Sequence, residues 1–186
     1  RIKADPRFSV TSKISHRVIY FNFDFLDRQS PFITGKDGKP LAKNPLKDPR
    51  VRKAISKAIN RPAIVEKVME GEAIPSGQLV ADFLFGATKN LKMDAYDPEG
   101  AKKLLAEAGY PDGFGLTIHA PNNRYVNDAK IAQTVAQMLS RVGIDTKVVA
   151  MPSSTFFTQA TDLKFSFMLL GWSTGTGEAS SSLKAL

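Results

Sequence analysis

Residues 44–73 read NPLKDPRVRKAISKAINRPAIVEKVMEGEA, a pattern typical of two consecutive helices. Asp48 can cap the first helix and Pro49 can begin it, because the first turn leaves unused the N–H that proline lacks. Asn60 can cap the second helix, and Gly71 suits a left-handed turn at its end. Apolar side chains recur at helical spacing on one face of the first helix, at Val51, Ala54, Ile55, Ala58 and Ile59. The stretch therefore predicts a helix pair with one buried face.

The remaining sequence predicts alternating strands and helices. Residues 18–23 are aromatic and β-branched and predict a strand, whereas residues 27–44 and 72–95 are polar or rich in Gly and Pro and predict irregular segments. Asp97 can cap a further helix. Strand, helix, strand, helix and strand are then expected at residues 116–120, 128–142, 144–150, 153–160 and 165–170. This order is typical of an α/β unit with a largely parallel sheet, whose ligands bind beyond the carboxyl ends of the strands.

Composition limits the classes of function. A chain of 186 residues with 42% hydrophobic residues can build the core of one domain, and the absence of cysteine excludes disulfides, thiolate metal sites and cysteine nucleophiles. The net charge of +8 is concentrated in residues 1–61. A basic half could bind nucleic acid, but these residues scatter without interleaved aromatic residues. We expect a solvated basic surface and no nucleic-acid partner, with a basic nucleic-acid-binding domain as the alternative.

Catalytic residues are scarce. His16 and His119 have no acidic neighbour in the sequence, and His119 alternates with Leu116 and Ile118, so we expect it at the surface or hydrogen-bonded. The serines lack the motif of a nucleophile, and no cluster has metal-ligand spacing. The sequence therefore predicts a binding module with no catalytic residue, cofactor or metal. A small α/β hydrolase or transferase is the weaker alternative.

The best binding chemistry lies in two loops expected at the carboxyl ends of strands, at residues 121–127 and 171–178. Arg124 can bind a carboxylate through two parallel hydrogen bonds, and Tyr125 adds an aromatic wall with a donor. The alternative is a loop arginine that only reaches solvent. Trp172 is the single tryptophan, and core packing is its ordinary role.

Four motifs occur in order along the chain. Residues 44–73 are followed by YDPEGAKKLLAEAGY at 96–110, by PDGF at 111–114, and by Gly171-Trp172 after an apolar run. Together they closely resemble the extracytoplasmic solute-binding proteins of peptide-type ABC importers, solute-binding family 5, over roughly residues 22–178. The resemblance implies a periplasmic-binding-protein-like α/β lobe with a mixed, largely parallel sheet and flanking helices. Residues 1–186 would then form a single lobe, excised from a larger two-lobed protein.

The resemblance also implies a function. Such a protein binds a peptide-like or other polar small solute in a cleft between two lobes and delivers it to permease subunits in the membrane. It would be periplasmic or otherwise extracytoplasmic, with or without attachment to the membrane, and a monomer without a cofactor.

The resemblance assigns roles to single residues as well. Arg124 resembles the arginine that pairs with the ligand's terminal carboxylate in the dipeptide-binding branch, and Trp172 the tryptophan that lines the ligand cavity. Gly175 stands where peptide-binding members commonly carry the Asp that receives the ligand's α-ammonium group. Either Glu178 supplies that charge, or neutral hydroxyls recognise a modified peptide, a sugar or another polar solute. The candidate ligand-binding residues are Asn122, Asn123, Arg124, Tyr125, Asn127, Trp172, Ser173, Thr174, Gly175, Thr176 and Glu178.

Overall fold

The computed structural model describes residues 5–26 and 28–184. Its strands form one mixed sheet, in which β3 runs parallel to β4 and β5, while β1 and β2 run antiparallel to β5 and β3. The strands are β1 Arg17–Phe23, β2 Ile33–Thr34, β3 Gly115–Pro121, β4 Asp145–Met151 and β5 Phe167–Ser173. The predicted α/β class with a mixed sheet is confirmed, and its parallel part is β3 with β4 and β5.

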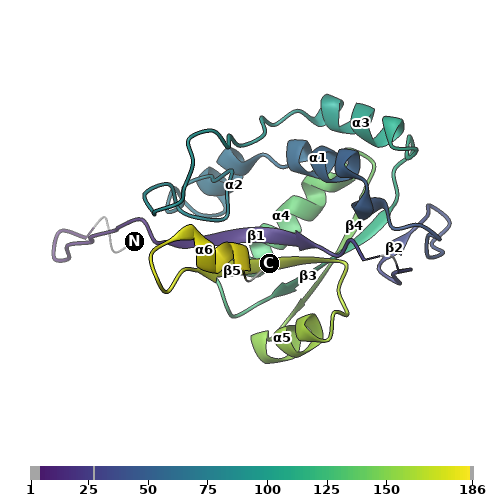
Figure 1. Cartoon of the computed structure of the whole chain (residues 1–186). Helices are drawn as coiled ribbons and strands as arrows, with labels where there is room; N and C mark the ends of the chain where they lie inside the picture. Colours follow the sequence, from purple (N-terminus) through teal and green to yellow (C-terminus); the bar gives the residue numbers. More distant parts are fainter. Residues whose placement is uncertain (1–4, 27, 185–186) are drawn as a thin grey trace.

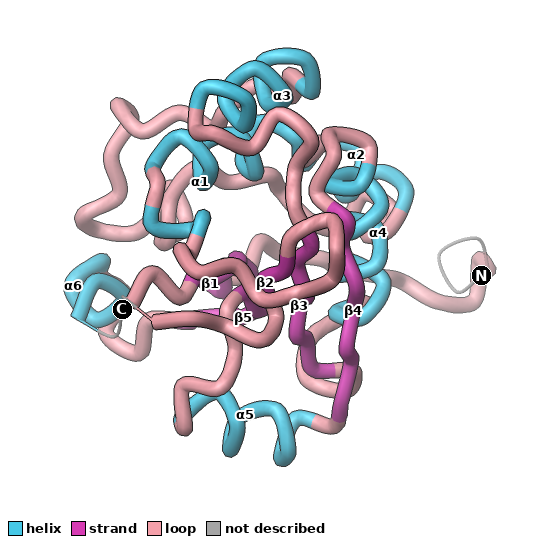
Figure 2. The backbone as a smooth tube through the Cα atoms, turned by 90° about the vertical axis from the view of Figure 1, so that its right-hand side faces the viewer, coloured by secondary structure: helices cyan, strands magenta, loops and turns pink. Residues whose placement is uncertain are grey.

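Helices cover both faces of the sheet (Figures 1 and 2). Four of them lie on one side, α1 Pro49–Ala58, α2 Arg61–Lys67, α3 Pro98–Glu107 and α4 Asp128–Ser140, and α5 Ser153–Thr161 lies on the other. A 3-10 turn at Pro45–Lys47 precedes α1, and a short helix, α6 Ala179–Lys184, follows β5. No described helix has the length and the apolar character of a membrane span.

The helix pair of residues 44–73 forms as predicted. The Asp48 carboxylate accepts a hydrogen bond from the Arg50 N–H at 2.8 Å, and the Asn60 side-chain oxygen accepts one from the Ala63 N–H at 3.1 Å. Gly71 has a φ of 80° and ends the segment in the left-handed conformation, where a residue without Cβ is favoured. All five predicted apolar residues of α1 are buried.

The main core lies between the sheet and the four helices. Leu116, Ile118 and Ala120 of β3 are buried there, in the same apolar cluster as the inward residues of α1 and α4. In the same cluster, Phe167 of β5 stacks on two rings of β1, with ring centroids 4.9 Å from Phe21 and 5.0 Å from Phe23. This packing fixes β1 against β5.

The prediction for His119 is wrong. The side chain is 2% exposed, and its Nδ1 has no hydrogen-bond partner within the described residues. Phe32 and Phe165 cover its ring, so β3 is buried on both faces near its end, although its alternating pattern predicted a half-buried strand. These two rings come from segments distant in sequence, and periodicity along one strand cannot reveal them.

One short strand and one strand end also differ from the predictions. Residues 27–44 were expected to be a loop, but Ile33 and Thr34 pair with Leu116 and Gly115 as the short strand β2. Strand β5 continues to Ser173, beyond the predicted end at residue 170, because β1 pairs with it along its whole length.

Candidate functional site

The carboxyl ends of β3, β4 and β5 lie at one edge of the sheet. Pro121 at the end of β3 pairs with Met151 at the end of β4, and β5 runs parallel beside β3. Strand β1 is antiparallel, so its first residue, Arg17, pairs with Ser173 at the end of β5. The edge therefore combines the loop after β3, the end of β5 and the start of β1.

Tyr125 joins the loop after β3 to β5. Its hydroxyl accepts a hydrogen bond from the Gly171 N–H at 2.9 Å and donates one to the Gly171 carbonyl at 3.3 Å. The ring lies where a side chain of residue 171 would be, since a Cβ there would be only 2.8 Å from Tyr125 Cε1. Burial, with a smaller contribution from Tyr125, raises the pKa of the nearby Tyr20 hydroxyl, so Tyr20 stays protonated at neutral pH.

Two guanidinium groups lie against the Tyr125 ring. The guanidinium carbon of Arg124 is 5.4 Å from the ring centroid, and that of Arg17 is 5.9 Å from it. Arg17 Nε also donates to Ser173 Oγ at 2.9 Å. The sequence gives no reason to place Arg17 here, because only the antiparallel pairing of β1 with β5 brings it to this edge.

Asp128 holds the main chain of the loop. This carboxylate is buried, with the residue 3% exposed, and accepts hydrogen bonds from the Arg124 N–H at 2.9 Å and the Tyr125 N–H at 3.0 Å. The Arg124 side chain is exposed, but its backbone is therefore fixed. Asp128 was not among the predicted site residues either, and its signal was an acidic residue at the first position of the helix predicted at 128–142.

The three asparagines of the loop have different surroundings. Asn123 accepts a hydrogen bond from the Ser153 N–H at 2.8 Å and so ties the loop to the start of α5. Asn127 has a φ of 56°, and its side chain donates to the Val68 carbonyl at 2.8 Å, near the end of α2. Asn122 is exposed. The geometry thus uses the side chains of Asn123 and Asn127 to join elements.

The remaining candidates lie along the end of β5 and the turn after it. Trp172 is 37% exposed and is therefore not a core residue, and the alternation of a strand directs it to the face opposite Ser173. Thr174 is buried, and its hydroxyl lacks a hydrogen-bond partner among the described residues. Gly175 and Thr176 are exposed. Glu178 accepts a hydrogen bond from the Ser180 hydroxyl.

The structure therefore gathers some of the predicted residues and separates others. Arg124, Tyr125 and Ser173 meet through Arg17 and Gly171, and we call these five residues the arginine–tyrosine cluster. Nothing in this cluster is acidic. Its exposed guanidinium groups suit the recognition of an anionic group such as a carboxylate.

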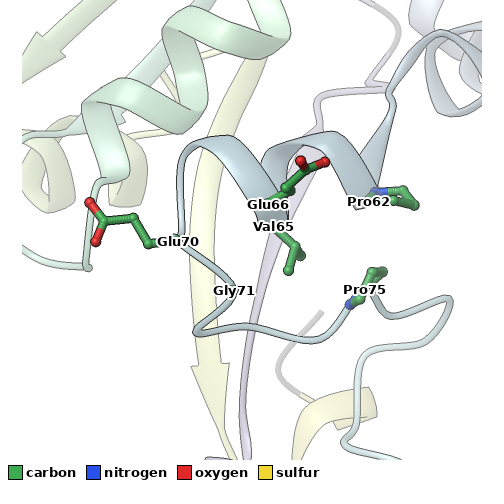
Figure 3. A pocket seen from close by; sticks show the side chains of 6 residues that line it. All are labelled: Pro62, Val65, Glu66, Glu70, Gly71 and Pro75. Atoms are coloured by element: carbon green, nitrogen blue, oxygen red, sulfur yellow. The ribbon is translucent and has the colours of Figure 1, made fainter. Parts of the chain in front are cut away.

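A shallow depression of about 620 Å³ lies at a different place, beside the end of α2. Figure 3 shows Val65 pointing toward Pro75 across it, while the Glu70 carboxylate points away from both. It contains none of the predicted ligand-binding residues.

Comparison with known proteins places the chain in a family. All residues, 1–186, match the model described as "Bacterial extracellular solute-binding proteins, family 5 Middle". Over 151 residues the chain is 34% identical to the glutathione-binding protein GsiB of Escherichia coli (strain K12), which corresponds to 78% of this chain and 29% of that protein. The chain thus spans less than a third of the length of the curated relatives it matches.

Solved structures agree in fold. The dipeptide binding protein of Pseudoalteromonas sp. SM9913 in complex with Met-Leu superposes with a TM-score of 0.74 at 24% identity, over 92% of this chain and 31% of that one. HbpA2 of Haemophilus parasuis gives a TM-score of 0.75 at 23% identity, over 95% of this chain and 32% of that one. With the family match over its whole length and this shared architecture, the chain belongs to the family 5 bacterial extracellular solute-binding proteins.

Proposed function

We propose that this chain is one α/β lobe of a two-lobed solute-binding protein that serves an ABC importer. The family match supports the class of protein. Since the chain spans 29% of GsiB, the proposal includes a further part of the protein that supplies the opposite wall of the site. Closure of two lobes around a solute is the motion typical of such proteins.

The observation that carries the proposal is the exposed guanidinium of Arg124, held over the fixed ring of Tyr125. It lies at the sheet edge where α/β folds bind ligands. Within the described residues it pairs with no carboxylate of the protein, so its charge is available to a solute. Glutathione and Met-Leu, named with two of the similar proteins, both carry carboxylates. A small carboxylate-bearing, peptide-like solute is therefore the favoured ligand class.

The rest of the proposal follows from the family. The protein would bind its solute outside the cytoplasm, in the periplasm of a bacterium with two membranes, and release it unchanged to membrane permease subunits. It would act as a monomer and as a binding protein without chemistry of its own. Membrane attachment, where present, would come from a part of the protein other than the described helices.

Thermal unfolding of the full-length gene product tests this proposal. A solute that binds only the folded state must raise the melting temperature, by an amount that grows with its concentration. We expect a rise with at least one carboxylate-bearing solute from a panel of glutathione, dipeptides such as Met-Leu and oligopeptides. A panel of sugars serves as the comparison. If no member of either panel changes the melting temperature at millimolar concentration, the proposed function is wrong.

A further inference from the structure

Arg17 lies at the same edge of the sheet as Arg124, although the two residues are far apart in the sequence. It is the first residue of β1 and is paired with Ser173, the last residue of β5. The pleat of the two strands directs both side chains to the same face of the sheet as Gly171, against which Tyr125 packs. The arrangement follows from the backbone register and not from a chance surface contact.

The hydrogen bonds leave a defined part of Arg17 free. Its Nε donates to Ser173 Oγ at 2.9 Å, which fixes the orientation of the planar group. The two terminal nitrogens then form the remaining edge of the fork, the edge that can bind a carboxylate with two parallel hydrogen bonds. Arg17 has no ion pair with a carboxylate among the described residues, and the side chain is exposed.

Two positive charges held near one aromatic ring repel each other, and a bound anion relieves this repulsion. Arg17 and Arg124 both lie within 6 Å of the Tyr125 centroid, so both guanidinium groups are within reach of a solute that extends along the ring. The Asp128 carboxylate beside this loop accepts hydrogen bonds from the N–H groups of Arg124 and Tyr125 and forms no ion pair with either guanidinium among the described residues. The local excess of positive charge therefore favours a ligand with more than one negative group.

We infer that Arg17 is a second anion-binding residue of the solute site, positioned by Ser173, and that the site prefers solutes with two acidic groups over those with one. The inference rests on the proposed function and specifies its ligand class. Arg124 and Arg17 each bind one acidic group, and the Tyr125 ring forms the surface between them. Among the residues that the structure describes, none of the five in this cluster has an acidic side chain for a ligand ammonium, so anionic groups dominate the selection.

The test compares solutes that differ by one charge, with the full-length gene product. Calorimetry measures Kd for glutathione and for alanyl-glutamate, which carry two carboxylates, and for the monoamides of each. In the unmodified protein the Kd of each diacid should be at least about tenfold lower than that of its monoamide. This factor corresponds to the free energy of one hydrogen bond to a charged group. Arg17→Gln, which keeps a donor for Ser173, removes most of this preference. Ser173→Ala removes part of it.

A matched control is Arg141→Gln. Arg141 is also exposed, but it follows α4 at the opposite edge of the sheet, so its loss changes the net charge equally without changing the preference. An undiminished diacid preference in Arg17→Gln overturns the inference and leaves the proposed function intact. The same holds if the unmodified protein binds monoamides as tightly as diacids, or if Arg17→Gln weakens every solute equally together with the melting temperature. A protein that binds no solute of either panel refutes both.

Discussion

Among single residues, His119 has the most unusual environment. Its ring stacks on Phe165 with centroids 4.1 Å apart and meets the edge of Phe32 at 4.4 Å. Burial in this aromatic surrounding lowers the pKa of the imidazole from 6.5 to about 4. His119 is therefore neutral at neutral pH and acts as a packing residue.

This burial predicts that the protein loses stability in mild acid. Between pH 6.5 and about 4 the unfolded chain binds a proton at His119 and the folded chain does not, so the free energy of unfolding falls as the pH falls. The loss at the lower end reaches about 3 kcal/mol, from 1.36 kcal/mol for each pKa unit. Urea unfolding across this window measures it.

Two variants separate His119 from other titrating groups. His119→Leu keeps the ring's apolar surroundings and should flatten the pH dependence in this window, even if it shifts the overall stability. His16→Asn replaces the other histidine, which is exposed, and should preserve the slope. An equal slope in His119→Leu and the unmodified protein contradicts the prediction.

At the level of elements, the end of β5 and the loop after β3 behave as one unit. Tyr125 uses its hydroxyl to satisfy both main-chain groups of Gly171, as a neighbouring strand would. Asp128 holds the loop after β3 by accepting hydrogen bonds from two of its N–H groups, and Asn123 accepts one from the start of α5. The positions of the two arginines thus depend on packing between elements and not on loop flexibility.

Gly171→Ala should break this unit. The added Cβ would lie 2.6 Å from Ile19 Cδ1 and 2.8 Å from Tyr125 Cε1, so the ring has to move. We expect a loss of about 1–3 kcal/mol in the free energy of unfolding, the usual range for overpacking, and weaker solute binding. Chemical denaturation and calorimetry measure the two effects.

Gly175→Ala is the matched control for this change. A Cβ at Gly175 meets nothing within 4 Å, and the residue lies a few positions further along the same segment. Its stability should stay within about 0.5 kcal/mol of the unmodified protein. Equal effects of the two substitutions would show that the contact between Tyr125 and Gly171 does not hold the site.

Local signals predicted the elements well. Asp48, Asn60 and Asp97 cap helices that begin with proline in the first turn, because capping depends only on residues within a few positions. The rule on carboxyl ends of strands also placed the loop after β3 and the end of β5 at one edge of the sheet, but strand alternation directs Trp172 to the face opposite Ser173. Arg17, Asp128 and the burial of His119 were not predictable in this way, since each depends on strand register or on rings from distant segments.

For the whole molecule, the excess of positive charge is spread over ion pairs and solvent. Lys53 pairs with Asp94 at 2.5 Å and Lys57 with Asp97 at 2.7 Å, so part of the basic half already has acidic partners. Two arginines of this half lie against aromatic rings, Arg7 on Phe8 and Arg52 on Phe25, each with its guanidinium carbon 5.8 Å from the ring centroid. We expect this charge to be solvated and not to form a nucleic-acid surface.

Duplex and single-stranded DNA should accordingly bind only feebly. At physiological salt we expect a dissociation constant no tighter than about 10⁻⁶ M, the range of non-specific binding. Fluorescence anisotropy with labelled oligonucleotides at several salt concentrations measures it. A submicromolar constant with a steep salt dependence would instead favour a nucleic-acid-binding domain.

We expect this edge of the sheet to bind a carboxylate-bearing solute through Arg124. Calorimetry of the full-length gene product with glutathione and Met-Leu tests it most directly, comparing the unmodified protein with Arg124→Ala, Arg124→Lys and the control Arg141→Ala. Arg124→Ala should weaken binding by roughly 2–5 kcal/mol, because closure leaves the solute carboxylate buried without its partner. Arg124→Lys should restore only part, since an ammonium lacks the planar fork. Unchanged affinity of Arg124→Ala for every carboxylate solute that the unmodified protein binds would contradict the claim.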